Sequence, residues 1–190
     1  MKIKLTFLQP LLGSTPKGDV YEQWIATRTP IVENGDEESA TAPDLEKGVT
    51  GFHRTEDGQP FIYDYVLKGF FKDACSMLRR APGTESTKLK AHNKIIDGLV
   101  FIQPRQIVLQ PSGPITMLSR PLRASTAQGD RVAIAVSECL PAGTTAEFAV
   151  EILGGVTDAA LREWLAYGAN RGLGQWRNAG YGSFTYEVLQ

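Results

Sequence analysis

The chain has 190 residues, of which 42% are hydrophobic and 22% are charged, a composition typical of a soluble globular protein and not of a disordered one. This length fits one domain whose core needs no disulfide or structural metal. We expect no signal peptide, because Lys2 and Lys4 interrupt the apolar residues at the N-terminus. We expect no membrane contact, because no stretch approaches the roughly 18 apolar residues of a membrane span. Cys75 and Cys139 lie in apolar segments, which predicts two buried thiols in a reduced, cytoplasmic protein.

The formal net charge of −1 argues against a protein that coats nucleic acid without specificity, but the charges are unevenly distributed. Between residues 68 and 131, 11 Lys and Arg stand against four acids, a local balance of +7. Eight acids lie in one run between Glu33 and Asp57. This asymmetry fits a polyanion-binding face, and it equally fits ordinary solvated surface.

The first half of the chain predicts a strand, an insertion and a helix. Residues 2–8 alternate, with Ile3, Leu5 and Phe7 on one face, which is typical of a half-buried strand. We interpret residues 29–60, which hold the acidic run and several Gly and Pro, as a long irregular acidic insertion. Apolar residues at helical spacing predict a helix over 65–80.

The second half is rich in strand patterns. A polar, basic connector over 84–94 precedes an apolar strand pattern that is broken at Pro104. Residues 115–139 predict a β-hairpin that turns at 128–130, and residues 145–153 alternate as a strand with one wet face. Thr157 is expected to cap a second helix, and residues 183–189 form a closing strand.

Without the insertion and the hairpin, the predicted order is strand, helix, strand, strand, helix, strand. This order indicates an α+β fold of the ferredoxin-like (RRM-like) type, with an antiparallel sheet and two helices. We therefore predict a single domain over residues 1–190, with the loop insertion at 29–60 and the hairpin insertion at 115–139. RNA-recognition motifs share this plan, although the fold alone does not give a function.

The most informative motif lies between the second helix and the closing strand. Gly172-x-Gly174 and Gly180-x-Gly182 are separated by five residues. Paired glycines let backbone amides approach an anionic ligand, while Arg171, Trp176 and Arg177 add charge and a stacking surface. The motif is neither a nucleotide P-loop nor a dinucleotide-binding fingerprint. A glycine-rich turn without a ligand remains the alternative.

Three segments, in the expected order, resemble one known family. The loop GLGQWRNAGYGSF resembles the C-terminal glycine-rich loop of the RAMP superfamily, the repeat-associated RNA-binding proteins of CRISPR systems. The stretch DGQPFIYDYVLKGFFKDAC is similar to the entry of CRISPR backbone subunits into their first helix, with Asp64, Tyr65 and Val66 in place of the usual Pro/Gly/Ser-rich residues. The stretch SECLPAGTTAEFAVEIL is similar to a strand entry of the same family.

The resemblance implies a ferredoxin-like core that binds RNA, and a thumb-like hairpin that lies across a guide RNA. Arginines in that hairpin would contact phosphates. The RNA-binding residues expected on this basis are Lys68, Lys72, Arg120, Arg123, Arg131, Arg171, Gly172, Gly174, Arg177, Gly180 and Gly182.

We therefore expect a CRISPR backbone-type subunit of antiviral defence that binds guide RNA and oligomerises along it, or joins other CRISPR effector subunits. One alternative is a metal-independent endoribonuclease that processes repeat RNA through His53 or His92. Another is a phage-borne or stand-alone RAMP-like interaction protein, which the modest net charge favours. Some backbone subunits cut target RNA with an acid after the first strand, where Asp36 and Asp44 lie here. Because no zinc-type cluster is visible, we predict no cofactor and no metal. Neither histidine has a convincing partner in the sequence, so we expect no catalysis, with endoribonuclease as the class if there is any.

Overall fold

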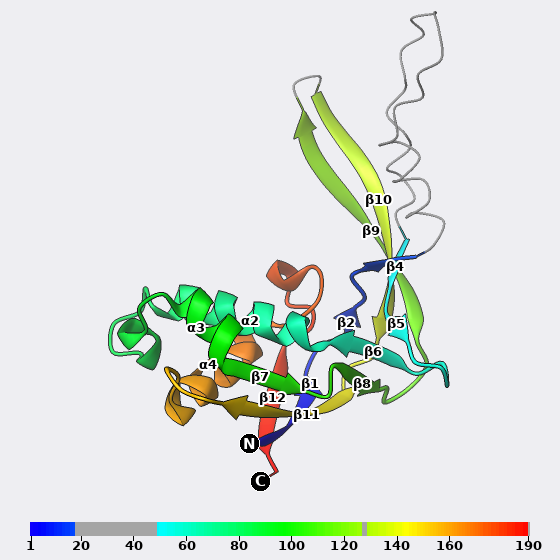
Figure 1. Ribbon diagram of the computed structural model, residues 1–190. Coiled ribbons are helices and arrows are strands. Elements are labelled where there is room, and N and C mark those ends of the chain that lie inside the picture. The colour runs from blue at the N-terminus through cyan, green and yellow to red at the C-terminus, as the bar shows by residue number, and fades with distance from the viewer. Residues whose placement is uncertain (18–48, 127–128, 190) are drawn as a thin grey trace, which may run out of the picture.

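This computed structural model describes residues 1–17, 49–126 and 129–189, and for residues 122–126 and 129–133 it describes the backbone alone. The part of the acidic insertion before residue 49, with Asp36 and Asp44, lies outside the described residues. Within the described residues the chain forms three α-helices and two sheets (Figure 1). The predicted α+β class is confirmed.

The larger sheet has seven strands, and every pair in it is antiparallel. Its main path runs β12 (Phe184–Val188), β1 (Lys2–Phe7), β11 (Thr145–Ile152), β8 (Gln106–Gln110), β6 (Pro60–Tyr63) and β5 (His53–Arg54). The seventh strand, β7 (Val100–Gln103), pairs with β11 at the end opposite to β8. The strand predicted at residues 2–8 is therefore central, because β1 pairs with β12 on one side and with β11 on the other.

The second sheet carries the long hairpin. Strand β9 (Thr116–Thr126) pairs with β10 (Gly129–Leu140), and the pair projects away from the body of the protein (Figure 1). The foot of β10 also pairs with β2 (Leu11–Leu12) and β4 (Val49–Gly51), and β4 pairs with β3 (Thr15–Pro16). Gly129 and Asp130, which the sequence predicted in the turn, pair with Thr126 and Ser125 and so belong to the strand.

A buried carboxylate holds the foot of the hairpin to the strands beside it. Glu138 on β10 is only 5% exposed. It accepts hydrogen bonds from the Lys17 ammonium, from Arg54 Nη2 at 2.8 Å and from the Phe52 amide at 2.9 Å. Burial alone would raise the pKa of Glu138, but these donors and the two cations hold it below its ordinary value. Glu138 therefore stays ionised and joins β10 to residues 17, 52 and 54.

Three helices pack on one face of the large sheet: α2 (Asp64–Leu78), α3 (His92–Leu99) and α4 (Asp158–Arg171). The cap predicted at Thr157 is confirmed, because its Oγ1 accepts a hydrogen bond from the Ala160 amide at 3.1 Å. The segment predicted as a connector over 84–94 instead holds a short 3-10 helix, η2 (Glu85–Lys88), and the start of α3. Buried Ser86 fixes η2 by accepting a hydrogen bond from Trp164 Nε1 at 2.9 Å.

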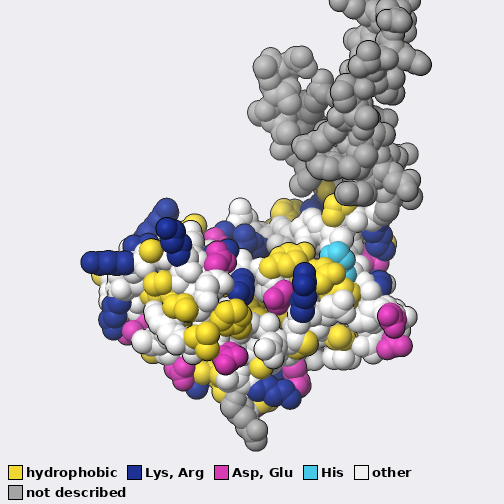
Figure 2. All heavy atoms as spheres, viewed as in Figure 1, with side chains coloured by type: hydrophobic (Ala, Val, Ile, Leu, Met, Phe, Trp, Pro, Cys, Tyr) yellow, Lys and Arg dark blue, Asp and Glu magenta, His cyan; other side chains and the backbone are white. Residues whose placement is uncertain are grey.

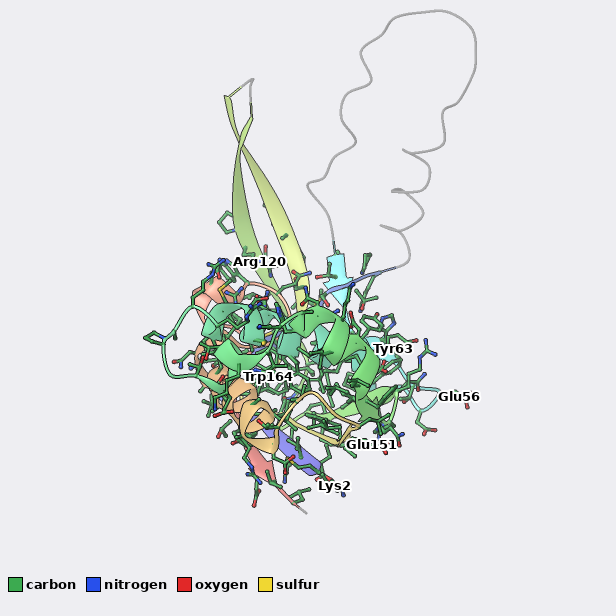
Figure 3. The ribbon with its side chains drawn as sticks, turned by 60° about the vertical axis from the view of Figure 1, so that its left-hand side comes forward. Lys2, Glu56, Tyr63, Arg120, Glu151 and Trp164 are labelled. Atoms are coloured by element: carbon green, nitrogen blue, oxygen red, sulfur yellow. The ribbon has the colours of Figure 1, made fainter. Side chains whose placement is uncertain are left out.

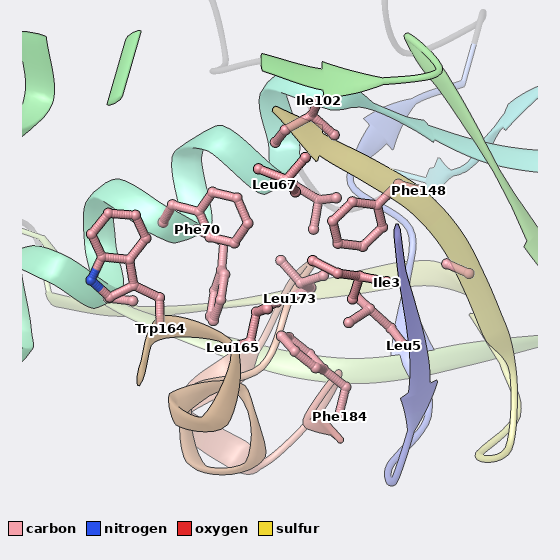
Figure 4. Close-up of a cluster of buried hydrophobic side chains, with 14 of the residues drawn as sticks. Ile3, Leu5, Leu67, Phe70, Ile102, Phe148, Trp164, Leu165, Leu173 and Phe184 are labelled. Carbon is pink, nitrogen blue, oxygen red and sulfur yellow. The ribbon is translucent and has the colours of Figure 1, made fainter. Parts of the chain in front are cut away.

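The core fills the space between the sheet and the helices (Figure 4). Ile3, Leu5 and Phe7 of β1 face it, as their alternation predicted, and the largest fully buried side chain is Trp164 of α4. Both cysteines are buried and free, as predicted. Among the described residues, none of the helices is long and apolar enough to cross a membrane.

Candidate nucleic-acid interface

The glycine-rich loop between α4 and β12 lies close to the foot of the hairpin (Figure 1). All four of its predicted glycines adopt a positive φ, between 70° and 87°. The loop closes on itself through the Leu173 amide, which donates to Gly182 O at 2.9 Å, and it docks on the chain after β1 through the Gly182 amide, which donates to Pro10 O at 2.8 Å. The amides of Gly172 and Gly180 also donate within the protein.

Three of these glycines are needed because other backbone lies against them. A Cβ added at Gly182 would lie 1.9 Å from Leu173 O, one at Gly172 2.6 Å from Tyr181 O, and one at Gly174 2.7 Å from Leu12 O. Only at Gly180, among the four, would an added Cβ meet nothing within 4 Å. The loop is thus a tightly packed structural element, and three of its glycines are required for the packing of the loop itself, with or without a ligand.

Two predicted RNA-binding arginines in this region meet one carboxylate on α2. Arg171 Nε lies 2.8 Å and Arg177 Nη1 lies 3.0 Å from Asp73 Oδ2. Burial would raise the pKa of Asp73, but both guanidinium groups act against it and hold the pKa below its ordinary value. The cluster carries two cations and one anion, so it keeps a net positive charge while it anchors the loop to α2.

Arg120 stands at the foot of the hairpin (Figure 3). It is 5% exposed, and its guanidinium donates to Ser137 Oγ at 3.1 Å and to Gln175 Oε1 in the glycine-rich loop. Desolvation lowers its pKa from the ordinary value. Arg120 therefore connects the hairpin to the loop, whereas the sequence predicted a contact with RNA phosphate.

Trp176 provides an exposed aromatic surface beside this contact. Its ring is stacked on Tyr181 with centroids 5.1 Å apart, and the Arg120 guanidinium lies 5.2 Å from the ring centroid. Trp176 is 39% exposed and has a φ of +57°, a left-handed conformation that costs a non-glycine residue about 1 kcal/mol. A stacked, partly exposed indole next to basic groups is the kind of surface on which unpaired bases stack.

The two predicted lysines of α2 lie on a different side of that helix, next to α3. Lys72 Nζ forms an ion pair with Asp97 Oδ1 at 2.8 Å. Lys68 Nζ donates to Asp97 O at 3.2 Å and lies 5.0 Å from the Phe101 ring centroid. The structure thus brings Arg120, Arg171, Arg177 and the glycines together and leaves Lys68 and Lys72 apart from them.

Arg123 and Arg131 lie in the paired strands of the hairpin, with their side chains outside the described residues.

The two histidines lie in separate places. His53 is in β5, next to Phe61 and Tyr63. His92 begins α3, with Nε2 at 2.8 Å from Ser76 Oγ and Nδ1 at 3.0 Å from Arg79 Nη1. Since a guanidinium can only donate, Nδ1 is the acceptor and neutral His92 carries its proton on Nε2. Burial, followed by the charge of Arg79, lowers the pKa of His92.

The sequence reasoning missed four residues that build the hairpin foot and the loop anchor: Asp73, Ser137, Gln175 and Tyr181. Gln175 and Ser137 are 38 residues apart, and Arg171 and Asp73 are 98 residues apart, so no local sequence pattern predicts these contacts. Gln175 and Tyr181 lie inside the glycine-rich motif, so the motif itself could have indicated these two.

No family model and no curated protein matches this chain. Solved structures do share its fold. One is a chain of the type III-B Cmr-beta complex bound to cognate target RNA, with a TM-score of 0.52 and 14% identity over 98% of this chain and 58% of that one. Another is a chain of a type IV-B CRISPR complex, with a TM-score of 0.52 and 13% identity over 98% of this chain and 89% of that one. This chain therefore spans little more than half of the Cmr-beta chain.

Proposed function

We propose that this chain is an RNA-binding subunit of the CRISPR backbone type, related to the RAMP superfamily, that binds guide RNA and oligomerises along it. The observation that carries the proposal is a fold shared over 98% of the chain with components of two CRISPR complexes, one of them bound to RNA. The three sequence segments that resemble the family also support the proposal. They lie at the start of α2, at β10–β11 and in the glycine-rich loop.

The strand pairing supports a ferredoxin-like core for this subunit. Strands β12, β1, β11 and β7 lie side by side in that order, all antiparallel. The crossover from β1 to β7 contains α2, and the crossover from β11 to β12 contains α4. This order fits the split βαβ arrangement, to which the hairpin β9–β10 would be added as the thumb-like element.

The proposed RNA path runs along the foot of the hairpin and over Trp176. Bases would stack on the indole, and the net positive cluster of Arg171, Arg177 and Asp73 would face phosphates. Lys68 and Lys72 would add a second phosphate contact on α2, and Arg123 and Arg131 a third along the hairpin.

Purified protein tests this directly. Size exclusion with absorbance at 260 and 280 nm should show a ladder of species that carry RNA, and fluorescence anisotropy should show binding of labelled single-stranded RNA. Replacing Lys68 and Lys72 by Gln should flatten the slope of log affinity against log salt by about 1 to 2, because each neutralised phosphate contributes about 0.7. The charge-matched Lys2→Gln, Lys4→Gln protein is the control. A clean monomer that binds no RNA at low salt contradicts the proposal.

A second candidate is the repeat-processing endoribonuclease, and one observation favours it. His92 is held by Ser76 and Arg79 at hydrogen-bond distance, beside a cavity of 390 Å³ that both arginines 79 and 80 line. If Arg79 turned from His92 to a bound phosphate, the freed Nδ1 of the neutral imidazole would be the general base and the two arginines the anion site. Discrete cleavage of hairpin RNA in metal-free buffer, lost in His92→Ala, would establish this activity. An uncleaved substrate supports binding alone.

A further inference from the structure

A row of aromatic rings runs from the core to the surface beside the foot of the hairpin, on residues that the proposed RNA path does not use. His53 stacks on Phe61 with centroids 5.4 Å apart, and it makes a T-shaped contact with Tyr63, with centroids 4.8 Å apart. Tyr63 in turn stacks on Tyr65, with centroids 5.3 Å apart and planes inclined by 19°. These rings come from β5, from β6 and from the first turn of α2.

The row ends at solvent. Phe61 is 3% exposed, whereas Tyr65 is 58% exposed, so the outermost ring presents its surface to the outside. Figure 2 shows a histidine and several hydrophobic side chains gathered on this face, and Figure 3 shows Tyr63 on the flank of the molecule away from Arg120. Phe61 and Tyr63 are two residues apart on one strand, and that alternation is a sequence signal for a shared face.

The rings line a cavity of 320 Å³. Its other wall comes from Ser14, Thr15 and Pro16 and from Gly51 and Phe52, so the cavity combines the rings of the row, His53 included, with two hydroxyls. This volume is at the small end of the range of about 300–1,000 Å³ for ligand pockets, which fits one planar heterocycle better than a longer ligand.

A positive charge lies beside one of these rings. The Arg105 guanidinium is 5.9 Å from the Tyr63 ring centroid, and Arg105 is exposed. Its backbone is fixed in place, because Arg105 O accepts a hydrogen bond from the Asp64 amide at 2.9 Å. Among the described residues Arg105 forms no ion pair, so its charge is available to an anion outside the cavity.

We propose that this cavity binds one unpaired nucleobase, stacked on the outermost ring, Tyr65, with Arg105 at the adjoining phosphate. The inference rests on the proposed RNA binding and adds a base site to it. Every base has a π-face that stacks on aromatic rings, and sequence-tolerant sites combine such rings with a basic group that follows the backbone. An apolar side chain of a second copy would gain nothing from the arginine beside Tyr63 or from the hydroxyls in the wall.

The chain has only two histidines, which gives the test an internal control. His53 is part of the row, and His92 begins α3 at the opposite side of the molecule (Figure 1). In ¹⁵N-labelled protein, adenosine and uridine 5′-monophosphate should shift the imidazole signals of His53 and leave those of His92 in place. Ribose 5-phosphate, which lacks the base, should shift neither. A silent His53, or equal shifts with ribose 5-phosphate, overturns the proposal.

A pair of substitutions at Tyr65 extends the test to RNA. Tyr65→Phe keeps the ring and should bind single-stranded RNA within about twofold of wild type, whereas Tyr65→Leu keeps only apolar surface and should bind about fivefold more weakly or worse. Equal RNA affinity in the two variants overturns the base site, and so does a change confined to self-association in Tyr65→Leu.

The two proposals fail in different ways. If the protein binds RNA but mononucleotides do not shift the His53 signals, only the base site is refuted. If mononucleotides shift the His53 signals but the protein binds no RNA, the proposed function is refuted and the cavity is a nucleotide site.

Discussion

Gly180 and Gly182 differ in the space around them although both have a left-handed backbone, with φ of +87° and +70°. At Gly180 an added Cβ meets nothing within 4 Å, so alanine there should cost only the backbone strain, about 1 kcal/mol. At Gly182 the added Cβ would lie 1.9 Å from Leu173 O, which is backbone and cannot rotate away. The two variants therefore separate conformational strain from steric conflict.

The magnitude at Gly182 follows from what must move. To relieve the conflict, the chain has to give up the hydrogen bonds from the Leu173 amide to Gly182 O and from the Gly182 amide to Pro10 O. Each contributes about 1 kcal/mol, and with the strain the total reaches about 3 kcal/mol or more. For a chain of this size, 1 kcal/mol corresponds to a Tm change of about 2–4 °C.

We therefore expect Gly180→Ala to lower Tm by about 2–4 °C and Gly182→Ala to lower it by about 6–12 °C. Urea unfolding at 25 °C should give the same order, and RNA affinity should be compared at a temperature at which both variants are folded. If the two variants unfold within about 0.5 kcal/mol of each other, an amount comparable to the usual effect of a surface substitution, the packing argument for this loop is refuted.

Three further outcomes follow from the contacts. Glu138→Gln should lower the free energy of unfolding by about 2 kcal/mol at pH 7 in urea titrations. Because the folded state lowers the pKa of Glu138, the difference in stability between wild type and variant should reach its maximum above the ordinary pKa of about 4.3. It should vanish as the pH falls through the pKa of the folded state. Asp73→Asn should destabilise the fold yet tighten RNA binding in anisotropy assays at low salt, since it leaves the charges of Arg171 and Arg177 unopposed; weaker binding would move the RNA elsewhere. Thr157→Ala should cost about 1 kcal/mol through the lost cap of α4, measured by thermal unfolding, with Thr157→Ser close to wild type as the control.

The local elements of this protein could be predicted from the sequence because each is encoded by neighbouring residues. The alternation of Ile3, Leu5 and Phe7 gave β1, and the spacing of apolar residues gave α2 to within two residues at its end. The cap at Thr157 and the two strands of the hairpin followed from equally short patterns. The segment 84–94 was not predicted because η2 and the start of α3 are short and polar, and long-range contacts such as Trp164 to Ser86 hold them in place.

The candidate site depended on the tertiary structure to a much greater degree. The sequence by itself identified the glycine-rich loop, and its basic residues, as an unusual element, but the partner of each basic residue lies far away in the chain. Arg120 is buried against Gln175, 55 residues later, and Arg171 is paired with Asp73, 98 residues earlier. From the sequence alone, such side chains are indistinguishable from charged residues at the surface. Only the folded chain brings their partners within hydrogen-bond distance and removes the charged groups from water.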